Sequence, residues 1–185
     1  MKKVFWLVVV GLTLLTPGAC RAQAKCPWLN AATAGGVLGG VVEMTVSTPK
    51  PNGATPKTEP GVYNQDQNRM DRFDFSCEFK RKAGSSVYSL AIAVTTMNDP
   101  AKEYAAFPAQ CAGPTVALRA IGNEAVQCVL KPAGSASVEE QVIARIRDRA
   151  FVLTIRRPSG VDNPAGGALS DTARNVAEQV AGSIF

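Results

Sequence analysis

The chain has 185 residues, of which 46% are hydrophobic and 19% are charged, with a formal net charge of +5 and no histidine. The lack of histidine excludes Ser-His-Asp and Cys-His catalysis and most zinc sites, because histidine is the commonest general base and metal ligand in proteins. We therefore expect no catalytic residue, no metal site and no cofactor.

The N-terminus has the pattern of a secretory signal peptide. Two lysines precede an apolar run over residues 4–15, and Ala22-Gln23-Ala24 has the small-x-small pattern of a cleavage site. The run is shorter than the roughly 20 apolar residues that a helix needs to cross a bilayer, which argues against a membrane anchor. We expect residues 1–24 to be removed and residues 25–185 to form one exported domain, periplasmic or secreted.

Cys20 leaves an alternative open, because it has the position of an acylated lipoprotein cysteine. Pro17 stands where the usual lipoprotein box has Leu or a similar aliphatic residue, whereas the later cleavage site is close to ideal. We favour a released product, with a lipid anchor on Cys20 as the alternative. A membrane partner is expected only if Cys20 is lipidated.

The charge of the exported part is close to balanced. Three of the 20 basic residues and none of the 15 acidic residues precede residue 25, so the remaining net charge is +2. Nucleic-acid binding requires a concentrated basic surface. We therefore expect no nucleic-acid partner.

Four cysteines follow residue 24, and an even number in an exported chain predicts two disulfides. Of the three pairings, we predict Cys26–Cys77 and Cys111–Cys128. Cys77 falls in a predicted strand, and Cys26 opens a segment that we expect to pack on the core face of that strand. The loop-entropy model gives the two closures about 4 and about 3 kcal/mol of stability.

The first part of the domain predicts a helix, a strand and a long loop. Residues 28–39 are expected to form the helix, with Asn30 as its N-cap and glycines at its end, and residues 41–46 the strand. Residues 47–68 contain four prolines and few apolar side chains, which is typical of a long loop. We expect a surface loop, and the alternative is a segment that inhibits a secreted hydrolase.

The clearest strand signal comes next. Phenylalanines and Cys77 alternate with polar residues from Phe73 to Lys80, the period-2 pattern of a half-buried strand. Residues 87–95 form the expected partner strand, joined by a four-residue turn over residues 82–85. A slip of one residue would mix the two faces, so this register is preferred. The predicted pairs are Phe73–Val94, Phe75–Ile92, Cys77–Leu90 and Phe79–Tyr88.

The middle of the chain is expected to hold a short helix and another strand. Asp99-Pro100 has the residues of a helix start, and Pro108 limits this helix. Residues 125–130 are expected to form the strand, and residues 111–122 give no clear prediction.

A second hairpin is expected around a two-residue turn at Asp148-Arg149. The inner face of this hairpin is apolar throughout, while its outer face carries arginines. The predicted inner pairs are Val142–Ile155, Ala144–Leu153 and Ile146–Phe151.

The chain is expected to end in an amphipathic helix that Ser170 caps and that runs to about Ser183. Strand runs flanked by helices at both ends predict an α+β fold. We therefore expect an antiparallel β-sheet built from hairpins, with helices packed on one face and two disulfides.

Four segments carry a resemblance to known proteins: Cys26-Pro27-Trp28-Leu29 through Leu38-Gly39, Ser76-Cys77-Glu78-Phe79, Ile121-Gly122-Asn123-Glu124-Ala125 and the run from Val142 to Leu153. In these segments the chain resembles small exported bacterial α+β domains of unknown function. Such domains occur in cell-envelope lipoproteins and as extracellular sensor domains of actinobacterial serine/threonine kinases. The resemblance implies a disulfide-linked fold and a binding role, and it offers no catalytic residues.

An arginine cluster is the sharpest candidate binding site. Arg145, Arg147 and Arg156 are expected on the outer face of the second hairpin, with Arg149 at its turn and Arg157 at its end. Guanidinium groups bind carboxylates and phosphates in a bidentate way, so the expected partner is an unknown, anionic envelope component. The alternative is a solvated face that protects the sheet from aggregation.

Carboxylates offer the only visible route to catalysis without histidine. Glu124 is a candidate buried carboxylate, and Asp71 and Asp74 are candidate halves of an acid/base pair. The sequence does not place two of them across a cleft. We therefore expect a non-catalytic binding or sensing module of the cell envelope, with a secreted-hydrolase inhibitor or a carboxylate-dependent envelope hydrolase as alternatives.

Overall fold

The computed structural model describes residues 25–48, 74–111, 113–130 and 136–185. Several expectations therefore lie outside the described residues: the signal peptide and Cys20, nearly all of the 47–68 loop, Asp71, and the predicted pair Phe73–Val94.

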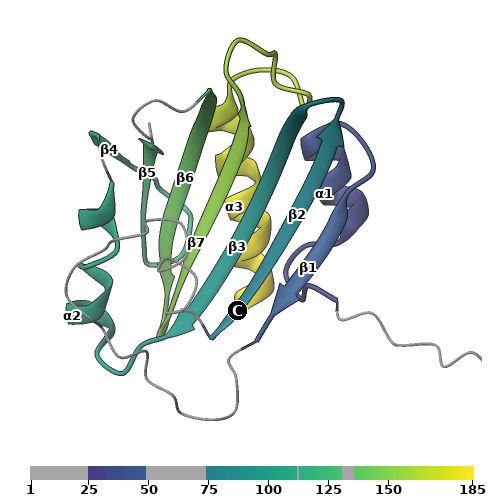
Figure 1. Cartoon of the computed structure of the whole chain (residues 1–185). Coiled ribbons are helices and arrows are strands. Elements are labelled where there is room, and N and C mark those ends of the chain that lie inside the picture. The colour runs from purple at the N-terminus through teal and green to yellow at the C-terminus, as the bar shows by residue number, and fades with distance from the viewer. Residues whose placement is uncertain (1–24, 49–73, 112, 131–135) are drawn as a thin grey trace, which may run out of the picture.

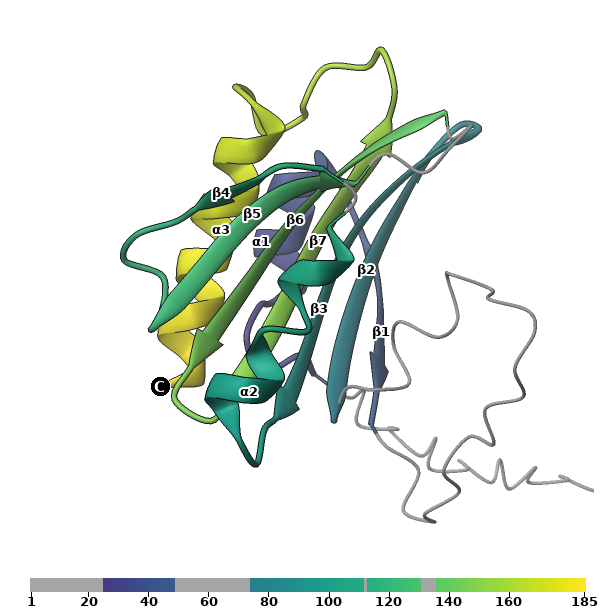
Figure 2. The same cartoon turned by 90° about the vertical axis from the view of Figure 1, so that its left-hand side faces the viewer.

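The fold is a seven-stranded antiparallel sheet with strand order β1-β2-β3-β7-β6-β5-β4. Two helices, α1 and α3, cover one face, and the short α2 lies against the other face (Figure 1; Figure 2). The expected α+β class is confirmed, and helices on one face describe α1 and α3. The strands are β1 (Glu43–Ser47), β2 (Phe75–Ala83), β3 (Ser86–Thr96), β4 (Thr115–Ala117), β5 (Glu124–Leu130), β6 (Ser137–Ile146) and β7 (Arg149–Pro158). The helices are α1 (Ala31–Leu38), α2 (Pro100–Tyr104), the 3₁₀ turn η1 (Pro108–Gln110) and α3 (Leu169–Ile184).

The main core lies between the sheet and the helices α1 and α3. The alternating residues of the central strands point into it, and Phe79, Leu90 and Phe151 are completely buried. The buried side of α3 combines aliphatic residues such as Val176 and Val180 with the small residues Ala173 and Ala177, which let the helix lie close to the sheet. Burial of each large side chain stabilises the fold by about 1.5–3 kcal/mol.

Both predicted disulfides are present. Cys26–Cys77 and Cys111–Cys128 have Cα–Cα distances of 5.8 and 6.0 Å, which are usual for a cystine. The segment that follows Cys26 packs on β2 as expected, where Trp28 meets Phe75 edge-to-face at 5.0 Å between ring centres. Two disulfides indicate that the chain folds in an oxidising environment outside the cytoplasm.

The register predicted for the first hairpin is wrong by two residues. Phe79 pairs with Leu90 and Cys77 with Ile92, because the turn between β2 and β3 contains only Gly84 and Ser85. Gly84 has φ +60°, a left-handed conformation that tight hairpin turns require and that glycine adopts at little cost. A shift of two residues keeps each side chain on its predicted face, so the apolar pattern alone cannot detect it.

The second hairpin shows the same two-residue error. The turn is Arg147-Asp148, so Ala144 pairs with Phe151. Arg147 has φ +56°, which is uncommon for a residue with a side chain. Its backbone N–H donates to Asn123 Oδ1 at 2.7 Å, and this contact from outside the hairpin supports the turn.

Element ends also differ from the prediction. The last helix begins at Leu169, one residue early, and its N-cap is Ala168 rather than Ser170. The preceding loop is held by Asn163, whose amide donates to Thr172 Oγ1 at 2.8 Å and to Gly166 O at 2.9 Å. By contrast, Asn30 caps α1 as expected.

A second, smaller apolar cluster lies on the other face of the sheet. Met97 and Tyr104 pack there against Ile143 and Ala150. The 111–122 segment, which gave no prediction, supplies the short edge strand β4. The face that carries the arginines is therefore partly covered by α2 and η1.

Candidate functional site

The five candidate arginines do not form one site. Arg145, Arg147 and Arg149 lie at the β6–β7 turn, whereas Arg156 and Arg157 lie at the other end of β7. Arg156 lies seven positions after Arg149, which corresponds to about 23 Å along an extended strand. One small anion cannot contact both groups.

Arg145 is already paired. Its Nε donates to Glu124 Oε1 at 2.9 Å, and its Nη2 contacts the same oxygen. The carboxylate of Glu124 is 51% exposed, so the expectation of a buried Glu124 is wrong. The Glu124–Arg145 pair joins β5 to β6 and locally neutralises the charge of Arg145.

The other arginines have varied partners. Arg147 is exposed, and its guanidinium lies 5.7 Å from the centre of the Phe185 ring. Arg149 is also exposed. Arg156 donates to Ser137 Oγ at 3.1 Å, with a Glu139 carboxylate oxygen at 3.8 Å. Arg147 and Arg149 are therefore the pair that faces solvent most openly.

Arg157 has a structural role at the C-terminal end of β7. Its Nη1 donates to the carbonyl oxygen of Val161 in the loop before α3. Its Nε is buried and finds no acceptor among the described residues. This arginine holds the loop rather than offering its charge to solvent.

Asp74 is the described member of the candidate acid/base pair, and its carboxylate has a structural contact. Asp74 accepts a hydrogen bond from the backbone N–H of Thr96 at 2.7 Å, which ties the start of β2 to the end of β3. Within the described ranges, no three His, Cys, Asp or Glu residues are grouped as metal ligands would be.

Glu140 is a buried carboxylate that the sequence analysis missed. It is 6% exposed, lies on the α3 face of the sheet, and accepts a hydrogen bond from Gln127 Nε2 at 2.9 Å. Burial raises the pKa of Glu140, and the Gln127 hydrogen bond partly opposes this shift. Strand alternation could have placed it on the inner face, beside Val142, once the β6 register was known.

Tyr104 is a buried phenol on the α2 face of the sheet. Its hydroxyl donates to the carbonyl oxygen of Ile143 at 3.1 Å. Burial raises the pKa of Tyr104 to about 12, with a further rise from the Glu124 charge and a decrease from Arg145. Tyr104 is therefore a neutral donor that holds α2 on the sheet.

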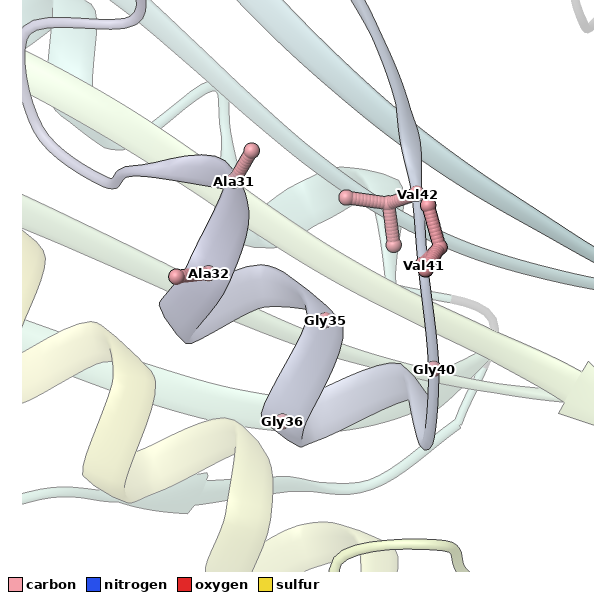
Figure 3. Close-up of a pocket in the computed structure, with 7 residues that line it drawn as sticks. All are labelled: Ala31, Ala32, Gly35, Gly36, Gly40, Val41 and Val42. Carbon is pink, nitrogen blue, oxygen red and sulfur yellow. The ribbon is translucent and has the colours of Figure 1, made fainter.

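An open apolar groove lies between α1 and the segment that leads into β1 (Figure 3). It has a volume of about 560 Å³ and contains no polar side chain. Val41 is 94% exposed at its wall, whereas the neighbouring Val42 packs partly against the core. The lining residues are Ala31, Ala32, Gly35, Gly36, Gly40, Val41 and Val42.

The C-terminal end of α1 and its hydrogen bonds determine the shape of the groove. Gly39 adopts φ +79°, and the N–H of Gly40 donates to Gly35 O at 2.8 Å. Arg81 caps the C-terminal end of α1, because its Nη1 donates a hydrogen bond to Leu38 O at 2.9 Å. A Cβ on Gly35 would lie 2.7 Å from the backbone oxygen of Gly40, so this close turn requires glycine at position 35. Paired glycines after a short helix are the signal that could have indicated this close turn.

Comparisons with protein-family models, with curated proteins and with solved structures find no match. The resemblance to lipoprotein and kinase sensor domains therefore stays a prediction. Among the described helices, none combines the length and apolarity that crossing a bilayer requires.

Proposed function

We propose that this chain is an exported binding or sensing module of the cell envelope that carries out no reaction. Its place is the periplasm or the extracellular medium, with lipid anchoring through Cys20 as the alternative form. The two disulfides support export, since cystines persist in oxidising compartments.

The observation that carries the binding role is the groove beside α1. A single exposed valine is ordinary on a protein surface, but Val41 borders a recess lined only by alanine, glycine and valine residues. Apolar recesses open to solvent are typical of ligand and partner sites. Hydrogen bonds from Gly40 and Arg81 hold the end of α1 at the groove, which lowers the cost of ordering this site on binding.

The hydrolase alternative has less support. Such an enzyme needs two carboxylates that converge on one substrate. Glu124 and Glu140 lie on opposite faces of the sheet, since Glu124 neighbours Arg145 and Glu140 lies on the α3 side.

The test uses the oxidised, purified chain immobilised and exposed to a detergent extract of the cell envelope. We expect capture of a component that rebinds in purified form at one-to-one stoichiometry by calorimetry. The reduced and alkylated chain is the control and should not bind. Failure of the native chain to retain any envelope component would contradict the proposal.

An anionic component would contact Arg147 and Arg149, the two open cations of the β6–β7 turn. Replacing both with alanine should then weaken capture and remove its dependence on salt, because exposed charge pairs are screened. Unchanged capture by this variant would restrict the partner to the apolar groove.

A further inference from the structure

β1 is an unprotected edge of the described sheet. It pairs only with β2, and its register runs without a bulge from Glu43↔Lys80 to Ser47↔Ser76. Edge strands leave backbone N–H and C=O groups free, and natural proteins usually protect them with lysine, proline, a bulge or a very short strand. The β1 sequence, Glu-Met-Thr-Val-Ser, has no lysine or proline, and its one charged residue is Glu43 at the start of the strand.

The opposite edge of the sheet is protected. β4 has three residues, Thr115–Ala117, and follows directly after Gly113 and Pro114. So short a strand offers few free backbone groups. The two edges therefore differ, and within the part of the chain that the structure describes, β1 is the edge with a strand's length of backbone that pairs on one side only.

The α1 groove is continuous with this open edge. Residues 40–42 form one wall of the groove and lead directly into β1 (Figure 3). Gly36 lies on the α1 side, and a Cβ built there meets no atom within 4 Å. An added strand lying along residues 40–47 would therefore pass an apolar recess with room for one of its side chains.

The edge also carries an uncompensated negative charge. Glu43 is exposed, and its cross-strand neighbour Lys80 instead pairs with Glu78 at 2.9 Å. Among the described residues, Glu43 has no ion pair. Opposite charges on neighbouring strands attract, so a strand added at this edge would favour a lysine or arginine beside Glu43.

We propose that β1 and the α1 groove together dock an extended segment of a partner protein, which adds to the sheet as an eighth strand. The segment places an apolar side chain in the groove and a basic side chain against Glu43. Backbone hydrogen bonds give such docking its affinity, and the side chains give its specificity. This inference rests on the proposed binding function and names its surface and its partner chemistry.

A second copy of the chain is a less suitable occupant. Antiparallel self-pairing of β1 about Thr45 would place Glu43 opposite Ser47 of the other copy. The charge of Glu43 would then remain without a partner. The charge on this edge therefore favours a basic segment from a different protein.

The test is selection of a phage-displayed library of linear dodecapeptides on the oxidised, biotinylated chain. We expect enriched peptides with alternating apolar residues and a lysine or arginine. Gly36→Leu fills the groove and should weaken the best synthetic peptide at least about tenfold, which corresponds to ~1.4 kcal/mol. Glu43→Arg should weaken it about fivefold, and a peptide with glutamate in place of its basic residue should restore binding.

Gly182→Leu is the matched control. Gly182 lies on an exposed part of α3, where an added Cβ also meets no atom within 4 Å. Both leucine variants should keep their thermal stability, because leucine has a higher helix propensity than glycine. Only Gly36→Leu should lose peptide binding.

Three results would overturn the inference. They are a selection that enriches no peptide, a peptide that binds Gly36→Leu and Glu43→Arg as well as the original chain, and a dimer in sedimentation that Gly36→Leu abolishes. An envelope partner that binds both variants normally would refute this surface while leaving the proposed binding function intact.

Discussion

The two faces of the sheet are held by different forces. The face under α1 and α3 is an extended aliphatic and aromatic core, with Phe79 and Phe151 completely buried. The face under α2 has a four-residue cluster, a disulfide to β5 and a few polar contacts. The first face combines a large buried core with the Cys26–Cys77 disulfide, whereas the second has little buried surface and relies more on its disulfide and hydrogen bonds.

Truncation of core side chains should show this difference most strongly. Phe151→Ala opens a cavity under α3 and should lower the free energy of unfolding by about 3–5 kcal/mol. Met97→Ala, in the α2 cluster, should lower it by about 2 kcal/mol. Urea denaturation of the oxidised chain measures both. Equal losses would show that the α2 face is packed as well as the α3 face.

The Cys26–Cys77 disulfide of the α1/α3 face should stabilise the fold more than the Cys111–Cys128 disulfide of the α2 face. Replacing Cys26 and Cys77 with serine should cost about 4 kcal/mol, and replacing Cys111 and Cys128 about 3 kcal/mol. The reason is loop length, because the bridges close sequence separations of 51 and 17 residues. Thermal unfolding of the two double variants compares them, and a reversed order would mean that loop entropy does not control their contribution.

The faces were predictable from the sequence, but the registers were not. Alternation placed Phe79 and Phe151 in the core, because the side chains of a strand alternate with a period of two. A two-residue shift leaves this pattern unchanged, so the turns decided the outcome. The first turn depends on Gly84, and the second on a hydrogen bond from the backbone N–H of Arg147 to Asn123 Oδ1 that no local pattern reveals.

The candidate sites were harder to predict for the same reason. Five arginines close in sequence are divided between two ends of a strand, and a partner from β5 neutralises Arg145. The groove needs the close return of Gly40 onto Gly35. Such contacts depend on the three-dimensional arrangement, which residue spacing does not encode.

Tyr104 tests the polar contacts of the α2 face. Tyr104→Phe removes the hydrogen bond to Ile143 O and should lower the free energy of unfolding by about 1 kcal/mol. Hydrogen exchange should also become faster in α2 while the rates in α3 stay unchanged. A uniform increase across both helices would mean that the two faces unfold together rather than separately.

Glu140 is a buried carboxylate on the apolar face, and its effect on stability should depend on pH. Burial holds the pKa of its carboxyl above the unfolded value. The folded state therefore binds this proton more tightly, and stability falls as pH rises from the unfolded pKa through the raised folded pKa.

Glu140→Gln keeps an oxygen that can accept from Gln127 but carries no charge. The variant should be more stable than the original chain at pH 7 and equal to it near pH 3.5, as measured by urea midpoints. A gain of the same size at both pH values would mean that charge burial is not its cause.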